Sequence, residues 1–139
     1  MVTLAGLIEK VKKDVDPSKV GMIVCHNGVV RGTSRAGLPA EFLEIDVDRL
    51  AWDRIIDEMR CEAGIAAIEA HLFTGVRQVG DDVMLVVVAG DIRENVFPVL
   101  ERTVNRLKAE AVLKEEKIRG LSLFPPEFKF RVFRKTMVR

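Results

Sequence analysis

The sequence predicts one α+β domain, residues 1–139, in which helices flank a mainly antiparallel sheet. A chain of 139 residues fits a single domain of ordinary size. Segments with helical spacing of apolar residues alternate with short runs rich in Val and Ile, in the order helix, strand, loop, strand, helix, hairpin, helix, strand. A turn signal joins two of these strands in a hairpin, which favours antiparallel pairing.

The chain begins with a predicted amphipathic helix and a buried strand. Residues 3–15 place apolar side chains at helical spacing and charged side chains on the opposite face. Residues 20–30 form an apolar run rich in Val and Ile, which favours a largely buried strand. The Gly- and Pro-containing residues 32–39 then predict a loop.

A second strand and helix follow this loop. Residues 41–47 resume a short strand, and Asp48 is suited to be the N-cap of a helix that ends near Ala63. Gly64 follows as the helix stop. The expected buried stripe of this helix consists of Leu50, Ile55, Ile56 and Met59.

The second half of the chain predicts a hairpin, a long helix and a last strand. Residues 65–79 and 82–89 are strand-like, and Val79 to Asp82 supply the turn between them. A long helix is expected beyond Gly90 and ends at about Lys117, with Pro98 tolerated in its first turn. Its buried face is predicted from Val96, Phe97, Leu100, Val104, Leu107 and Ala111. Alternating Phe128, Phe130 and Val132 suggest an edge strand within residues 120–139.

Composition excludes several classes of function. The 22 basic and 21 acidic residues give a net charge of +1, which argues against a general nucleic-acid binder. No apolar run reaches the roughly 20 residues that a bilayer span requires, and the first residues do not resemble a secretory signal. We therefore expect a cytoplasmic protein that does not bind membranes. The basic C-terminal segment is either a solvated surface or a contact for an acidic partner; its residues are Lys129, Arg131, Arg134, Lys135 and Arg139.

The familiar signatures of enzymes are absent from the sequence. There is no nucleophile elbow, no Walker loop, no dinucleotide fingerprint and no paired-cysteine metal site, so no metal or cofactor is predicted. Cys25 and Cys61 lie far apart, and we expect both to be reduced packing residues.

What remains is a set of basic residues near the ends of elements. Arg31 leaves a predicted strand and Arg93 opens the long helix, where backbone donors favour anions. Two such arginines could hold a phosphate in bidentate fashion if they meet in space. Lysines on a helix are usually solvated, and spacing alone does not distinguish Lys108 from that background.

Several short patterns in order resemble the molybdopterin synthase large (catalytic) subunit, the MoaE family, over residues 21–117. In chain order they are Gly28-Val-Val-Arg31, Leu43-Glu44, the spaced Gly75, Gly80 and Asp81, and the spaced Arg93, Phe97 and Lys108. The resemblance implies an α/β hammerhead fold and a homodimer within a heterotetramer. It also implies a small ubiquitin-like partner subunit whose C-terminal Gly-Gly bears a thiocarboxylate. That group donates sulfur to cyclic pyranopterin monophosphate.

The resemblance also assigns roles to the basic residues. Lys108 and Lys114 would be catalytic, with Lys108 acting as an electrostatic stabiliser or as an acid/base group. Arg31 and Arg93 would bind the substrate phosphate. Both the thiocarboxylate and the phosphate are anionic, so a pocket of fixed cations lowers the cost of bringing them together.

This chain departs from the family pattern at two places. Ile92 stands where the family has a histidine, and Leu113-Lys-Glu-Glu116 replaces a Pro- and Trp-containing segment. On an unbroken helix Lys114 would lie about 120° round from Lys108, so only a break near residues 109–112 brings them together. Lys117 is the alternative second lysine, and Arg119 ranks below Lys114.

The departures leave three readings of function open. The leading one is a working sulfurtransferase of the molybdopterin synthase type. The second is a catalytically inactive relative that binds or regulates through a ubiquitin-like partner. The third is a small-molecule binder of another kind.

Overall fold

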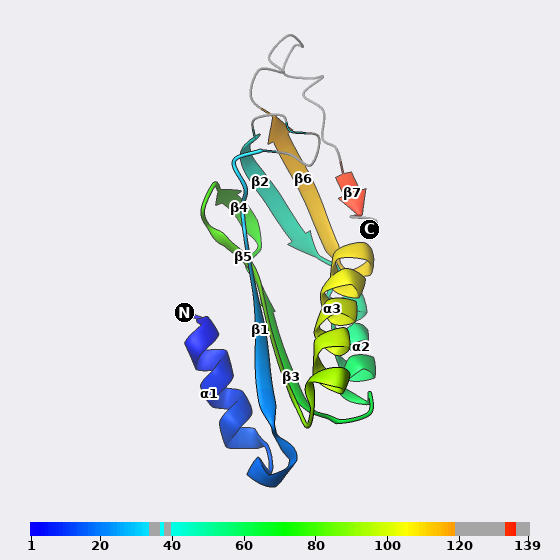
Figure 1. The fold of residues 1–139 in the computed structure, drawn as a ribbon. Helices are drawn as coiled ribbons and strands as arrows, with labels where there is room; N and C mark the ends of the chain where they lie inside the picture. Colours follow the sequence, from blue (N-terminus) through cyan, green and yellow to red (C-terminus); the bar gives the residue numbers. More distant parts are fainter. Residues whose placement is uncertain (34–36, 38–39, 119–132, 136–139) are drawn as a thin grey trace.

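The computed structural model describes residues 1–33, 37, 40–118 and 133–135, and Figure 1 shows their arrangement. The helices are α1 (Leu4–Asp14), α2 (Arg49–Arg60) and α3 (Arg93–Glu110), with a short 3-10 helix at Pro17–Lys19. The strands are β1 (Met22–Val29), β2 (Ala40–Val47), β3 (Ile65–Leu72), β4 (Gly75–Gln78), β5 (Asp82–Gly90), β6 (Val112–Ile118) and β7 (Phe133–Lys135).

The described strands form two sheets in which every pairing is antiparallel. The first sheet has the order β1-β5-β3 and the second has the order β4-β2-β6-β7. The second sheet extends from one end of the first, as Figure 1 shows. The predicted α+β class with an antiparallel sheet and flanking helices is confirmed.

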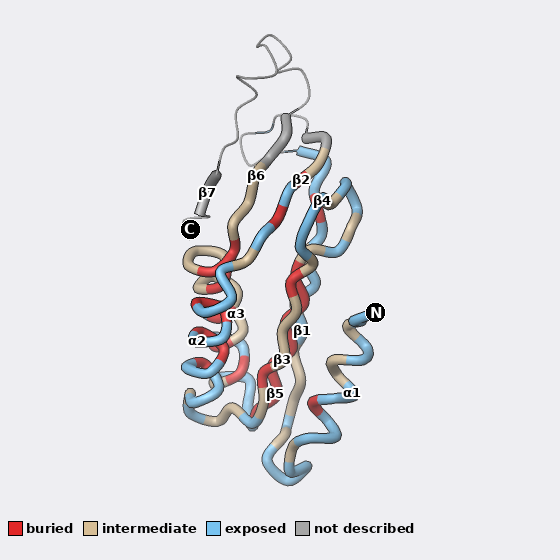
Figure 2. Tube along the Cα trace, turned by 180° about the vertical axis from the view of Figure 1, so that it is seen from behind, coloured by how far each residue is buried: buried red, intermediate tan, exposed pale blue. Residues whose placement is uncertain are grey.

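The first sheet lies between two helical layers. Helix α1 packs on one face of this sheet, and α2 and α3 pack on the other (Figure 1). The central strand β5 is buried on both sides, with Val87 and Ala89 packed beneath α1 and Val86 and Val88 in the larger cluster with α2 and α3. Figure 2 shows this strand as buried over most of its length. The near-continuous apolar run of β5 follows from burial on two faces.

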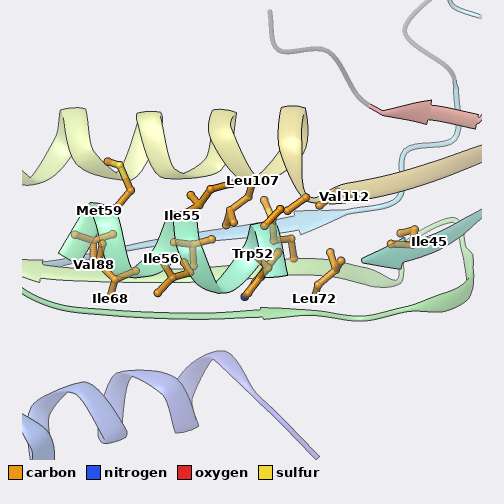
Figure 3. Close-up of a cluster of buried hydrophobic side chains, with 14 of the residues drawn as sticks. Ile45, Trp52, Ile55, Ile56, Met59, Ile68, Leu72, Val88, Leu107 and Val112 are labelled. Carbon is orange, nitrogen blue, oxygen red and sulfur yellow. The ribbon is translucent and has the colours of Figure 1, made fainter. Parts of the chain in front are cut away.

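Helix α2 begins where the sequence predicts, but one residue of its predicted stripe is wrong. The Asp48 carboxylate accepts a hydrogen bond of 3.1 Å from the backbone N–H of Ala51, which confirms it as the N-cap. Ile55, Ile56 and Met59 are buried in the main core, shown in Figure 3. Leu50 is 84% exposed, whereas Trp52 is 3% exposed and takes the place in the core that Leu50 was expected to fill.

The predicted strand 65–79 is divided between the two sheets. Residues 65–72 form β3 and pair with β5, whereas residues 75–78 form β4 and pair with β2. Gly75, which has φ of +89°, begins β4. The predicted turn before β5 forms, because Gly80 has φ of +90° and the Asp81 carboxylate accepts from the Gln78 N–H at 2.8 Å. It joins β4 to β5, which lie in different sheets, so the hairpin predicted at this turn is wrong.

Helix α3 ends seven residues earlier than predicted, at Glu110, and residues 112–118 form strand β6 instead. The carbonyl of Ala111 accepts a hydrogen bond of 2.8 Å from the N–H of Asp48, so the chain turns out of the helix against the β2–α2 junction. Backbone hydrogen bonds to β2 then take the place of the hydrogen bonds that a longer helix would make. Phe97 is also misassigned to the buried face, because it is 53% exposed while Val99 and Thr103 are buried. Pro98 lies in the second turn of α3, not the first.

Other predictions about the ends and the cysteines have mixed outcomes. The helix predicted over residues 3–15 is confirmed as α1, and the Thr3 hydroxyl caps it by accepting from the Gly6 N–H at 3.0 Å. Cys25 and Cys61 are free thiols, as expected, but both are exposed and so are not core packing residues. The predicted strand around residues 128–132 lies outside the described residues. In the described part of the chain, no helix is long and apolar enough to cross a membrane.

Candidate active site

A cavity of about 540 Å³ lies where the two sheets meet. Strands β1, β2, β3, β5 and β6 and the last turn of α3 all contribute residues to it. Its apolar lining comes from residues that continue the core toward the second sheet, of which Figure 3 labels Ile45, Leu72 and Val112. A volume of this size is typical of small-molecule sites.

Three of the predicted site residues line this cavity together. They are Arg31, Lys108 and Lys114. None of the described lining residues is acidic. The described lining therefore contains three cationic side chains beside apolar ones, which favours a ligand with an anionic and an apolar part.

The position of Arg31 depends on the turn between β4 and β5. Val30, the residue before Arg31, is 3% exposed, and its N–H donates to the carbonyl of Asp81 at 3.0 Å. Its own carbonyl accepts from the N–H of Gly80 at 2.9 Å. The backbone that leads to Arg31 is therefore fixed to the Gly80 turn through both the N–H and the carbonyl of Val30.

The two lysines meet because the chain breaks between them. Lys108 is half-buried in the last turn of α3, anchored by Leu107, which is fully buried. Ala111 ends the helix and is also fully buried, so Val112 starts β6 inside the core. The break falls within residues 109–112, where the sequence required it, and Lys114 reaches the same cavity as Lys108.

Arg93 does not reach this cavity within one chain. It is the first residue of α3 and Lys108 lies in the last turn, so at about 1.5 Å per residue the two Cα atoms are roughly 22 Å apart. The Arg93 side chain is 76% exposed and its Nε lies 3.2 Å from the carboxylate of Glu94. The two arginines of one chain are therefore not close enough to hold the same phosphate.

His26 is a residue of this cavity that the sequence patterns did not indicate. It lies on β1, two residues before Gly28, and both line the cavity. Burial, and secondly the positive charge of Lys108, lowers the pKa of His26 below its usual 6.5. The available signal was the polar pair His26 and Asn27 in the apolar run that leads to Arg31.

The described residues do not suggest a metal centre. No group of three or more His, Cys, Asp or Glu side chains among them is placed to hold a metal ion. Lys117, the alternative second lysine, has its backbone in β6, but its side chain lies outside the described part, as does Arg119.

Comparison with known families agrees with this fold. The model of the MoaE protein family matches residues 4–110, which is most of the chain. The chain belongs to the MoaE family. A relative described as a probable molybdopterin synthase, from Haloferax volcanii, is 31% identical over 121 residues. The match covers 83% of this chain and 46% of that protein, so the chain spans about half the length of this curated relative.

Solved structures of the MoaE family share the fold. Molybdopterin synthase from Staphylococcus aureus superposes with a TM-score of 0.67 and 21% identity, over 81% of this chain and 85% of that one. A complex of subunits 1 and 2 of molybdopterin-converting factor from Helicobacter pylori gives a TM-score of 0.64 and 16% identity, over 85% of this chain and 80% of that one. At these identities the likeness establishes the fold alone.

Proposed function

We propose that this chain is the catalytic subunit of a molybdopterin synthase. It transfers sulfur from the thiocarboxylated C-terminus of a small ubiquitin-like subunit to cyclic pyranopterin monophosphate, which builds the dithiolene of molybdopterin. Membership of the MoaE family supports this function. The observation that supports it most directly is the cavity shared by Arg31, Lys108 and Lys114.

The charge of the cavity suits the two reactants of this reaction. A thiocarboxylate and a cyclic phosphate are both anions, and they repel each other when they approach in water. Fixed cations within about 4 Å of each anion offset that repulsion and cost no reorganisation during the reaction. The apolar walls formed by side chains such as Leu43, Ile45 and Met84 suit the flat pterin ring.

The basic residues divide the work between binding and chemistry. Lys108 and Lys114 are the catalytic pair, which stabilise the charge that develops as sulfur is transferred. Arg31 binds the phosphate, because its planar guanidinium can donate two parallel hydrogen bonds to phosphate oxygens. Residues 1–139 act as one catalytic domain in this proposal.

Arg93 fits the same role only if a second copy of the chain supplies it. Ile92 and Phe97 lie next to Arg93 at the start of α3 and are each 53% exposed. Exposed apolar side chains around a cation are typical of a surface that another protein covers. We therefore infer a homodimer in which Arg93 of one copy contacts the phosphate in the cavity of the other.

The sulfur donor is a small ubiquitin-like subunit that ends in Gly-Gly, and the assembly is a cytoplasmic heterotetramer. The Helicobacter pylori neighbour is a complex of two subunits of the converting factor, which supports a small partner subunit. A slender Gly-Gly tail suits a cavity of about 540 Å³ because it lacks side chains.

Reconstitution tests this function against the inactive alternative. The chain is mixed with the thiocarboxylated small subunit and cyclic pyranopterin monophosphate, and the dithiolene product is measured by mass spectrometry after oxidation. We expect product formation that depends on all three components. A stable complex with the small subunit and no product would support an inactive relative. The absence of both product and complex would support a binder of another kind.

A further inference from the structure

Within the described part of the chain, Nε2 of His26 is a buried side-chain atom with no hydrogen-bond partner. Buried polar atoms in folded proteins are almost always paired, so an unpaired one requires a reason. A ligand that supplies the missing partner is one such reason. His26 is one of the residues that line the cavity, so a ligand in the cavity would lie beside its ring.

Gly28 provides the space that the imidazole occupies. The two residues lie on the same face of β1, because side chains alternate along a strand. A Cβ atom on Gly28 would lie 3.0 Å from Nε2 and 3.8 Å from Cε1 of His26. The missing side chain at Gly28 therefore leaves the ring room beside the cavity wall.

We propose that His26 contacts the substrate directly and forms a hydrogen bond through Nε2 with the polar edge of the pterin ring. This inference rests on the proposed function and names the residue that recognises the ring. Arg31, Lys108 and Lys114 already supply cations for the anionic groups. A pterin edge carries neutral donors and acceptors, and a neutral imidazole matches either kind according to its tautomer.

The electrostatic environment keeps His26 in the form that this contact needs. Its pKa is lowered below the usual 6.5, first by burial and then by the charge of Lys108, so the neutral form of the ring predominates at pH 7. A protonated imidazole would add a fourth cation to the cavity and could only donate hydrogen bonds. A neutral imidazole therefore favours the uncharged edge of the pterin ring over the anionic phosphate.

The test measures binding of cyclic pyranopterin monophosphate to the full chain by titration calorimetry. His26→Phe keeps an aromatic ring and removes Nε2, and we expect a dissociation constant about tenfold higher, equivalent to the loss of one hydrogen bond. His26→Gln should recover part of the affinity, because its amide can donate or accept. His71→Gln is the matched control, since His71 packs edge-on against Phe73 at 4.6 Å and does not line the cavity.

A second measurement separates recognition from a structural role. His26→Phe should leave the melting temperature of the free protein unchanged or higher, because it removes an unpaired buried nitrogen. It should raise KM for the pterin more than it lowers kcat. In the unsubstituted protein, the ¹⁵N resonance of His26 Nε2 should shift when the pterin is added, while that of His71 stays in place.

The outcomes distinguish this inference from the proposed function. If the chain forms product and His26→Phe binds the pterin as tightly as the unsubstituted protein, the contact is refuted and the synthase function stands. If the chain binds the pterin with the His26 dependence described above but forms no product with the small subunit, the synthase function is refuted and the contact stands. Failure to bind the pterin at all would refute both.

Discussion

Lys108 and Lys114 line one cavity although they belong to different kinds of secondary structure. Lys108 is in the last turn of α3 and Lys114 is on β6. Ala111 lies between them and is buried, and its carbonyl accepts a hydrogen bond from the N–H of Asp48 at the junction of β2 and α2. The pair of cations is therefore set by a tertiary contact that ends the helix, not by helical spacing.

Lys108→Ala should abolish most of the turnover and leave the fold intact. Removal of one preorganised charge at a reacting centre costs about 100- to 1000-fold in kcat in comparable sites. Lys108→Arg should keep part of the activity because it keeps the charge. Lys13→Ala on the exposed face of α1 is the control. Full turnover by Lys108→Ala in the reconstituted reaction would exclude its catalytic role.

Lys114→Ala should lower turnover by about tenfold or more, and Lys114→Glu should lower it further. The carboxylate of Glu would place a negative charge beside both anionic reactants, which reverses the attraction in the cavity. Lys117→Ala tests the alternative second lysine in the same assay. A greater loss in the Lys117 variant than in the Lys114 variant would move the assignment to Lys117.

Much of the fold could be predicted from periodicity, and the two errors in strand assignment share one cause. The cap at Asp48 and the turn at Gly80 depend on local chemistry, so they could be predicted. The segment 112–118 contains Leu, Lys and Glu, which are good helix formers, yet pairing with β2 holds it as a strand. The division of residues 65–79 between two sheets likewise depends on partners far away in the sequence.

Part of the candidate site could also be predicted from the sequence. The resemblance to a family identified Arg31, Lys108 and Lys114, and the structure places all three at one cavity. His26 was missed because a histidine within an apolar strand is usually a packed core residue. Its significance depends on the burial of Nε2 and on the glycine beside it, which only the folded structure reveals.

Gly90→Ala should destabilise the protein by more than about 2 kcal/mol. A Cβ atom on Gly90 would collide with the carbonyl oxygen of Gly64 and lie 2.7 Å from Cγ2 of Val96. Neither neighbour can move freely, because the first is backbone and the second is fully buried. Urea unfolding would measure the loss. Gly32→Ala is the control, because its nearest neighbour would be 4.0 Å away, and it should change stability by less than about 0.5 kcal/mol.

The free energy of unfolding should fall as the pH drops from 7 to 5. The pKa values of His26 and His71 are both below the usual 6.5, mainly through burial, with smaller contributions from Lys108 and Arg49 respectively. The unfolded chain therefore takes up protons near pH 6.5 while the folded chain resists them, which favours unfolding. The contribution of the two histidines to the free energy of unfolding is fully present above pH 6.5. It is lost as the pH falls toward their pKa values in the folded protein.

Unfolding in urea at pH 8, 7, 6 and 5 measures this dependence. His26→Phe should flatten the curve, and His71→Gln should flatten it independently. Asp16 and Asp91 have pKa values below 3.8 through hydrogen bonds within their own turns, so they act in a more acidic window. A free energy of unfolding that stays constant or rises as the pH drops from 7 to 5 would contradict the lowered pKa values of the two histidines.

Mixing two inactive variants should restore activity if Arg93 acts in the cavity of a second copy. Lys108→Ala removes the lysine from its own cavity, and Arg93→Ala removes the arginine from the cavity of the other copy. In an exchanged 1:1 mixture, half of the dimers would hold one variant of each kind, and each of these would contain one complete site. The expected recovery is about a quarter of the unsubstituted activity. If each variant alone is inactive and the mixture remains inactive after exchange confirmed by native mass spectrometry, Arg93 does not act across the dimer.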